Sequence, residues 1–238
     1  MEPVNLVLAA AAIALGAIVQ SISGVGGGFI MVPLLAMIDV GYLPGPMIFA
    51  TLALSTLMAW RERAAIDQLN VGWIVLATLP GAALGSWLLT RVPADRLGLI
   101  FGSMILLAIV ISTLGLKPAL NRATAVAAGF VAGTMGASSG IGAPAIAVLY
   151  QDKTGAGIRA TLALIYTLCS LLIVGVLAVF GKFDWQGVQT GFLLMPGMIL
   201  GYLLSRPLAG RLGQGTAARY GVLAVSAAAA LTLIVDSL

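Results

Sequence analysis

The pentapeptide Ala50-Thr51-Leu52-Ala53-Leu54 occurs twice in this chain, because Ala160-Thr161-Leu162-Ala163-Leu164 repeats it without a change. Each copy lies in an apolar segment and follows a glycine-rich stretch with a proline beyond it: Gly24-Val25-Gly26-Gly27-Gly28 with Pro33, and Gly140-Ile141-Gly142 with Pro144. Interrupted apolar segments at corresponding places in two halves of a chain are typical of secondary transporters built from internal repeats. The repeat therefore predicts a two-part membrane protein.

The composition points to the lipid bilayer as the solvent of this chain. Hydrophobic residues make up 61% of it and charged residues 8%, whereas soluble domains carry about 25% charged residues. So few charges could not cover a globular surface. The net charge is +4, but no basic stripe with interleaved aromatic residues is present, so we expect no nucleic-acid partner.

An enzymatic function is not expected from this sequence. The chain has no histidine, the commonest metal ligand and the commonest general base. The G-x-S-x-G string at Gly136–Gly140 lacks both a base and the strand-to-helix setting of a hydrolase nucleophile. The single cysteine, Cys169, lies in an apolar run and is expected to be buried and inert. We expect no cofactor and no metal.

Apolar segments of about spanning length define the expected fold. They cover residues 4–22, 46–60, 71–90, 96–116, 158–180, 187–205 and 216–235, and shorter apolar or small-residue stretches cover 28–38, 123–137 and 141–150. Residues 4–22 have no basic residue before them, so we interpret them as a membrane segment and not as a cleaved signal peptide. We predict an all-α polytopic membrane protein with two repeats of four helical elements, 1–116 and 117–238. The first element of each repeat is broken or re-entrant.

The loop charges favour an inverted relation between the two repeats. If all segments cross in simple alternation, giving eight crossings, the Lys and Arg residues divide seven to five. If residues 4–38 and 123–150 each form a hairpin that enters and leaves on one face, six crossings remain and the division is nine to three. The nine are Arg61, Arg63, Lys117, Arg122, Lys153, Arg159, Arg206, Arg211 and Arg219, and Arg91, Arg96 and Lys182 lie opposite. That bias is a positive-inside signal, and three crossings per half would invert the repeats.

The glycine-rich stretches are the candidate binding site. Glycine costs a helix about 1 kcal/mol relative to alanine, so four glycines in five positions indicate a deliberate break. A helix that starts inside such a break aims unpaired N–H groups and partial positive charge into it. Two such ends that converge near the midplane would hold a small anion. The candidate residues are the glycines, the nearby hydroxyls and one cation: Ser21, Ser23, Gly26, Gly27, Gly28, Thr51, Ser138, Ser139, Gly140, Gly142, Arg159 and Thr161.

Alternative interpretations of these residues remain open. The glycines could serve only close helix crossing, as we expect for the GxxxG pairs Gly81/Gly85 and Gly197/Gly201. The hydroxyls could bond carbonyls of their own helices. Arg159 could be a positive-inside anchor instead of an anion guide at the mouth of the site.

The same stretches resemble the TauE/SafE family of sulfite exporters, also called the sulfonate uptake permease family. The resemblance rests on Ser23–Leu35, on Gly140-Ile141-Gly142-Ala143-Pro144, on Arg159-Ala160-Thr161-Leu162 and on Gly181-Lys182-Phe183-Asp184-Trp185. The chain departs from the family pattern at Leu52 and Leu162, where many members carry Ser, and at Ala143 and Ala145, where many carry Gly and Pro.

The resemblance implies a multi-pass transporter of small sulfur-containing anions in the cell membrane, the inner membrane of a bacterium. We expect sulfite or an organosulfonate as substrate and alternating access around the two breaks, with export and uptake, the coupling ion and homo-oligomer formation left open. The alternative is an anion channel or accessory membrane subunit whose glycines serve helix packing only.

Overall fold

The computed structural model describes the chain except residues 1–2, 94–95, 151–155, 209–215, 236 and 238. The described residues form α-helices and short 3-10 turns and contain no strand, which confirms the all-α prediction. The α-helices are α1 (Pro3–Ser23), α2 (Gly27–Ile38), α3 (Gly45–Arg61), α4 (Val71–Arg91), α5 (Leu97–Thr113), α6 (Arg122–Ser139), α7 (Ala143–Ala147), α8 (Ala156–Val179), α9 (Trp185–Leu208) and α10 (Thr216–Val235). The 3-10 turns are η1 (Val40–Tyr42), η2 (Arg63–Ala65) and η4 (Val148–Tyr150).

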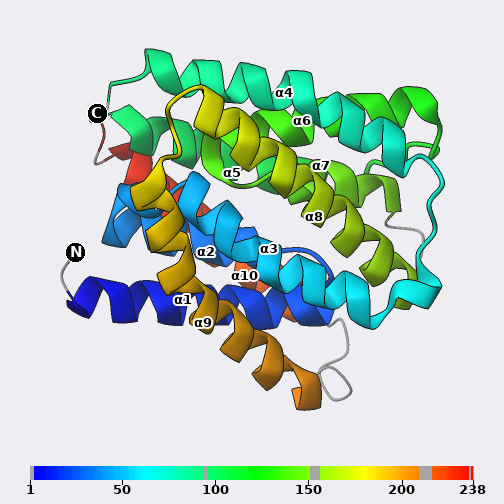
Figure 1. Ribbon diagram of the computed structural model, residues 1–238, viewed down its shortest axis with the longest axis horizontal. Helices are drawn as coiled ribbons and strands as arrows, with labels where there is room; N and C mark the ends of the chain where they lie inside the picture. The colour runs from blue at the N-terminus through cyan, green and yellow to red at the C-terminus, as the bar shows by residue number, and fades with distance from the viewer. Residues whose placement is uncertain (1–2, 94–95, 151–155, 209–215, 236, 238) are drawn as a thin grey trace.

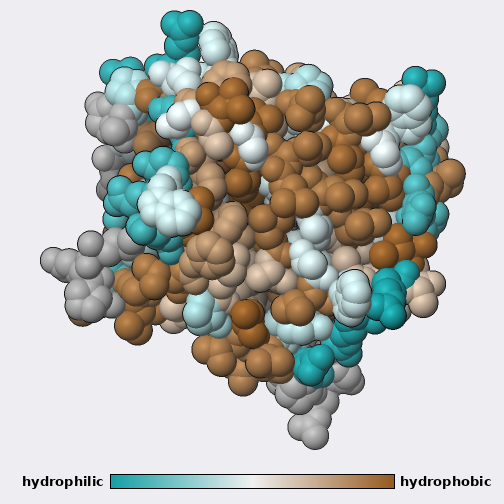
Figure 2. Space-filling model, in the orientation of Figure 1, coloured by the Kyte–Doolittle hydropathy of each residue, from teal (hydrophilic) through white to brown (hydrophobic). Residues whose placement is uncertain are grey.

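Four of these helices, α1, α4, α8 and α9, are long and apolar enough to cross a membrane. Most of the long helices run along the horizontal axis of Figure 1. On the face drawn in Figure 2, hydrophobic residues cover the middle of the molecule and hydrophilic residues gather toward the two ends of that axis. This distribution, together with the long apolar helices, is that of a multi-pass membrane protein.

Helices α4 and α6 run parallel, and they pack closely because glycines line both sides of their contact. A Cβ on Gly81 or Gly85 of α4 would clash with the carbonyl oxygens of Phe130 or Thr134 in α6. A Cβ on Gly129 or Gly133 of α6 would clash with carbonyl oxygens of α4 in turn. Backbones this close are typical of small-residue interfaces in membranes.

Helices α1 and α9 also run parallel, but only α9 supplies the glycines. A Cβ on Gly197 would lie 2.5 Å from the carbonyl oxygen of Ala10, and one on Gly201 would clash with that of Ala14. The predicted packing role of both GxxxG pairs is therefore confirmed: each pair lets a different neighbouring helix approach.

Two other helix pairs are antiparallel. The end of α3 lies beside the start of α8, where Glu62 pairs with Arg159. The start of α5 lies beside the end of α10, since a Cβ on Gly98 would lie 2.8 Å from the carbonyl oxygen of Leu233. Each of these pairs joins one helix from residues 1–116 to one helix from residues 117–238.

These contacts divide the helix ends between two ends of the bundle. We call the end at which α3 ends and α8 begins the arginine-rich end. The start of α6 lies there too, because the Arg122 guanidinium covers the Trp73 ring at the start of α4, 3.7 Å from its centroid. Six of the nine Lys and Arg residues with described side chains lie at or near this end: Arg61, Arg63, Lys117, Arg122, Arg159 and Arg206.

Arg91, Arg96 and Lys182 lie toward the opposite end. Lys153, Arg211 and Arg219, which belong to the predicted set of nine, have no described side chains.

Candidate functional site

The first helix break lies between α1 and α2 and begins with a serine–glycine cap. Gly24 has φ +78°, and its N–H donates to the Gln20 carbonyl at 2.7 Å. The Ser23 hydroxyl donates to the Val19 carbonyl at 2.7 Å and accepts the Val25 N–H at 3.3 Å. Gly26 has φ +102°, which only glycine adopts without strain. The chain then enters α2, a helix of 12 residues.

The second break, between α6 and α7, repeats this cap. Gly140 has φ +86°, and its N–H donates to the Gly136 carbonyl at 2.8 Å. The Ser139 hydroxyl donates to the Met135 carbonyl at 2.8 Å and accepts the Ile141 N–H at 3.3 Å. The helix after this cap is shorter than α2, because α7 has only five residues before the 3-10 turn Val148–Tyr150.

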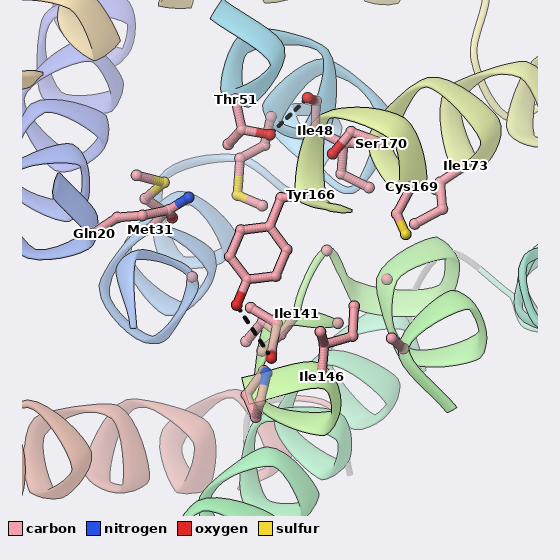
Figure 3. A pocket seen from close by; sticks show the side chains of 18 of the residues that line it. Gln20, Met31, Ile48, Thr51, Ile141, Ile146, Tyr166, Cys169, Ser170 and Ile173 are labelled. Carbon is pink, nitrogen blue, oxygen red and sulfur yellow. Dashed lines mark hydrogen bonds between the residues drawn. The ribbon is translucent and has the colours of Figure 1, made fainter. Parts of the chain in front are cut away.

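The two breaks meet at one small cavity. A Cβ on Gly28 would lie 3.5 Å from the Ile141 side chain and 3.9 Å from the Gly140 carbonyl oxygen. The cavity beside this contact has a volume of about 80 Å³ and is lined from both breaks and from α3 and α8. Figure 3 shows the Tyr166 ring of α8 at its centre, with Gln20, Thr51, Ser170 and Ile141 around it.

Five of the residues predicted from the sequence line this cavity. They are Gly26, Gly28, Thr51, Gly140 and Gly142. The Thr51 hydroxyl donates to the Ile48 carbonyl of its own helix at 2.7 Å, so it must rotate before it can donate to a ligand.

The other seven predicted residues lie outside the lining. Ser21, Ser23, Ser138 and Ser139 bond carbonyls of their own helices, as the alternative interpretation describes. Gly27 packs on α1, because a Cβ there would lie 2.5 Å from Gln20 Oε1 and 2.8 Å from the Gly16 carbonyl oxygen.

Arg159 and Thr161 lie at the arginine-rich end, away from the cavity lining. Arg159 forms an ion pair with Glu62 at 2.9 Å. Thr161 donates to the Gly157 carbonyl at 2.7 Å and accepts the Asp67 N–H at 2.9 Å. The two identical pentapeptides therefore place their threonines differently: Thr51 at the cavity and Thr161 under the loop that follows α3.

Three polar residues of the lining were not among the predicted ones: Gln20, Tyr166 and Ser170. No hydrogen bond joins the side chain of Gln20 or Ser170 to another described residue. The Tyr166 hydroxyl has only a long hydrogen bond, 3.5 Å, to the Ala143 carbonyl. In Figure 3 the Gln20 amide approaches the cavity from one side and the Ser170 hydroxyl from the other. A polar side chain inside an apolar membrane segment is the sequence signal that marks such residues.

The lining offers hydrogen-bond donors but no formal charge. None of the described residues that line the cavity is Lys, Arg, Asp or Glu, and the described part of the chain has no group of three His, Cys, Asp or Glu residues that could hold a metal ion. Amide, hydroxyl and backbone N–H donors suit the oxygen atoms of a small oxyanion. The N-terminus of α2 adds partial positive charge at the same place.

Comparison with known proteins assigns a family to the chain. The family model described as Sulfite exporter TauE/SafE matches residues 8–233, nearly the whole chain. No curated protein and no solved structure gave a match.

Proposed function

Because the chain belongs to the TauE/SafE family of sulfite exporters, we propose that it carries a small sulfur-containing anion, sulfite or an organosulfonate, by alternating access around the cavity between the two breaks. The observation that carries this proposal is the meeting of both breaks at one uncharged, donor-lined cavity. In this proposal the family supplies the class of substrate and the cavity supplies the place where it binds.

The proposed site binds its anion without a buried cation. At the start of α2 the Phe29 N–H donates to the Gly26 carbonyl at 3.1 Å, so the N–H groups of Gly27 and Gly28 are the ones left to face a ligand. The helix dipole favours negative charge beside them. The Gln20 amide and the Ser170 hydroxyl complete the set of donors, and Thr51 and Tyr166 join it when their hydroxyls turn from carbonyl oxygens toward the ligand. A site built from dipoles holds an anion without the cost of burying an unpaired lysine or arginine.

Helix α7 contributes less charge than α2 to this site. It is a helix of five residues, so few peptide dipoles align behind its start. We assign it to the wall of the cavity, where Gly142 lies against the Ala132 carbonyl of α6.

Alternating access requires two halves that can exchange roles, and the helix pairing supports such halves. α1 packs in parallel on α9 as α6 packs on α4, while α3 meets α8 and α5 meets α10 in antiparallel fashion. A two-fold axis in the membrane plane would produce this pattern, because it exchanges the first two pairs and turns each helix of the last two onto an antiparallel partner. We propose inverted repeats at 1–116 and 117–238.

The distribution of Lys and Arg indicates which end of the bundle faces the cytoplasm. We place the arginine-rich end in the cytoplasm, following the positive-inside rule. Asp39 follows α2 toward the opposite end and Asp67 lies at the arginine-rich end. In a Cys169→Ser background, single cysteines at these two positions should react with impermeant reagents from opposite sides. Labelling of both from one side would refute the hairpin arrangement.

Flux in liposomes distinguishes a carrier from the alternative, a channel or an accessory subunit. We expect uptake of radiolabelled sulfite to saturate and to show counterflow when the liposomes are loaded with unlabelled sulfite. Gln20→Leu should reduce this flux, because it removes the free amide from the cavity. Ser21→Ala is the matched control, since the neighbouring Ser21 hydroxyl bonds its own helix. Flux that rises linearly with concentration, or equal loss in both variants, would contradict the proposal.

A further inference from the structure

The ion pair between Arg159 and Glu62 joins two helix ends at the arginine-rich end of the bundle. Arg159 is in the first turn of α8, Glu62 caps the end of α3, and their side chains approach to 2.9 Å. Arg159 also covers the first break, because its Cγ lies 3.3 Å from the position of a Cβ on Gly24. The pair therefore lies directly outside the glycine stretch whose next residues line the cavity.

Neither charge is explained by the stability of its own helix. A helix end favours cations at its C-terminus and anions at its N-terminus. Glu62 places a negative charge at the C-terminus of α3, and Arg159 places a positive charge near the N-terminus of α8. Each residue opposes its own helix dipole, so the favourable partner of each charge is the other residue of the pair and not its own helix.

The position of the pair relative to the cavity fits an entrance. Tyr166 follows Arg159 by seven residues on α8, which is about 10 Å along the helix axis. The loop after α3 packs on the first turns of α8, because the Asp67 N–H donates to Thr161 at 2.9 Å and the Ala65 carbonyl lies 3.2 Å from a Cβ position on Gly157.

We propose that the Glu62 carboxylate is an internal occupant of an anion-binding position on Arg159, and that this ion pair closes the arginine-rich end of the route to the cavity. An incoming oxyanion takes the place of the carboxylate, which releases the loop after α3 and opens the route. The anion part of this inference rests on the proposed function, whereas the closure does not.

The strength of the pair suits a closure that must open repeatedly. The Arg159 and Glu62 side chains are 30% and 21% exposed, so water screens the interaction. Partly exposed pairs contribute little stability, and an anion that binds the guanidinium equally well can replace the carboxylate.

The matched position in the first half carries a different side chain. Phe49 precedes the first Ala-Thr-Leu-Ala-Leu as Arg159 precedes the second. Its ring packs with Phe183 at 5.8 Å and with Phe192 at 5.2 Å between centroids, toward the opposite end of the bundle. The ionic closure is therefore one-sided, and its loss should affect access from one face only.

Cys169 gives a readout that needs no transported substrate. It is the single cysteine of the chain and lines the cavity. It is buried, with its Sγ 3.2 Å from the Thr78 hydroxyl, so it should react slowly in the closed protein and faster when the route to the cavity opens. We would measure its rate of modification by an impermeant anionic methanethiosulfonate and by a neutral one, in inside-out and right-side-out membrane vesicles. The variants are Glu62→Gln and Arg159→Gln, with Arg63→Gln as the control that removes a charge from the same loop without touching the pair.

Loss of about 1 kcal/mol of closure should accelerate modification about fivefold in both variants with the neutral reagent, and the control should match the wild type. The anionic reagent should react faster with Glu62→Gln than with Arg159→Gln, because only the former keeps a free guanidinium. For both variants its acceleration should be confined to one vesicle orientation.

Unchanged rates with the neutral reagent, or acceleration of the anionic reagent in both orientations or in neither, would overturn the closure. Equal rates of the two variants with the anionic reagent would overturn the anion position on Arg159. If the wild-type protein binds no sulfur-containing anion, the proposed function is contradicted. The rates with the neutral reagent still test the closure, because they require no transported substrate.

Discussion

The two helix breaks share one cap and differ in the helix to which the cap leads. Ser23-Gly24 and Ser139-Gly140 use the same hydrogen bonds and the same left-handed glycine. The first cap leads into the 12-residue helix α2, and the second leads into the five-residue helix α7. The similar Ser-Gly sequences therefore end α1 and α6 in the same way. The lengths of the helices that follow differ, because the surroundings of the two breaks differ.

The difference extends to glycines at matched positions. Gly26 has φ +102° and room for a Cβ, which would make an ordinary contact with Val19 Cγ1 at 3.7 Å. Gly142 has φ −100°, but a Cβ there would come nearer than 3.0 Å to the Ala132 carbonyl oxygen. One glycine is required by backbone conformation and the other by space. We interpret the first break as the electrostatic part of the anion site and the second as its closely packed wall.

The largest effect is expected at Gly142. Gly142→Ala forces a methyl group against the α6 backbone, which cannot yield as a side chain can, so we expect a loss of about 3 kcal/mol, the upper range for overpacking. Unfolding in detergent measures it, and Gly142→Asn should be worse still because it is larger. If Gly142→Ala is as stable as the wild type, lack of space does not restrict the second break, and the difference inferred between the two breaks is wrong.

A smaller loss of stability is expected at Gly26, and there the larger Asn side chain should cost less than Ala. Gly26→Ala should cost about 1–2 kcal/mol, the strain of an L-residue in the left-handed region. Gly26→Asn should cost less than Gly26→Ala, because asparagine tolerates that region. The same unfolding experiment tests both, and a larger loss for asparagine than for alanine would show that space and not conformation limits this position.

The smallest effects separate the two threonines of the repeat. Thr161→Val should lower the free energy of unfolding by about 1 kcal/mol, because the Asp67 N–H loses its acceptor. Thr51→Val should leave unfolding nearly unchanged and weaken sulfite binding by about tenfold, equivalent to about 1.4 kcal/mol. Binding and melting measurements on both variants check this, and identical behaviour of the two would contradict their different surroundings.

Helix positions could be predicted from the sequence because apolar run length and glycine breaks are local properties. The segments expected at 28–38 and 71–90 became Gly27–Ile38 and Val71–Arg91. The length of α7 could not be predicted, because 141–150 is an uninterrupted apolar stretch like 28–38, and the close approach of Gly142 to the Ala132 carbonyl of α6 is a tertiary contact that the sequence does not show.

The residues that line the cavity could be predicted only in part, because glycines mark a helix break in the sequence but hydroxyls do not mark a site. Glycine runs mark a break wherever it lies, so Gly26, Gly28, Gly140 and Gly142 could be identified. A hydroxyl in a helix carries no local sign of whether it faces a ligand or its own carbonyls. Ser138 and Ser170 therefore could not be told apart until their neighbours were known.

The central claim is that the two breaks together form one anion site, and Gly28→Ala tests it most directly. The added methyl would meet Ile141 at 3.5 Å, an ordinary contact that the fold accepts, but it would lie between the two breaks. Gly175→Ala is the matched control, because nothing lies within 4 Å of a Cβ there. Equilibrium binding of radiolabelled sulfite to the purified proteins should be weakened at least about tenfold by Gly28→Ala and unchanged by Gly175→Ala, with both variants melting like the wild type. Wild-type affinity in a folded Gly28→Ala protein would contradict the account.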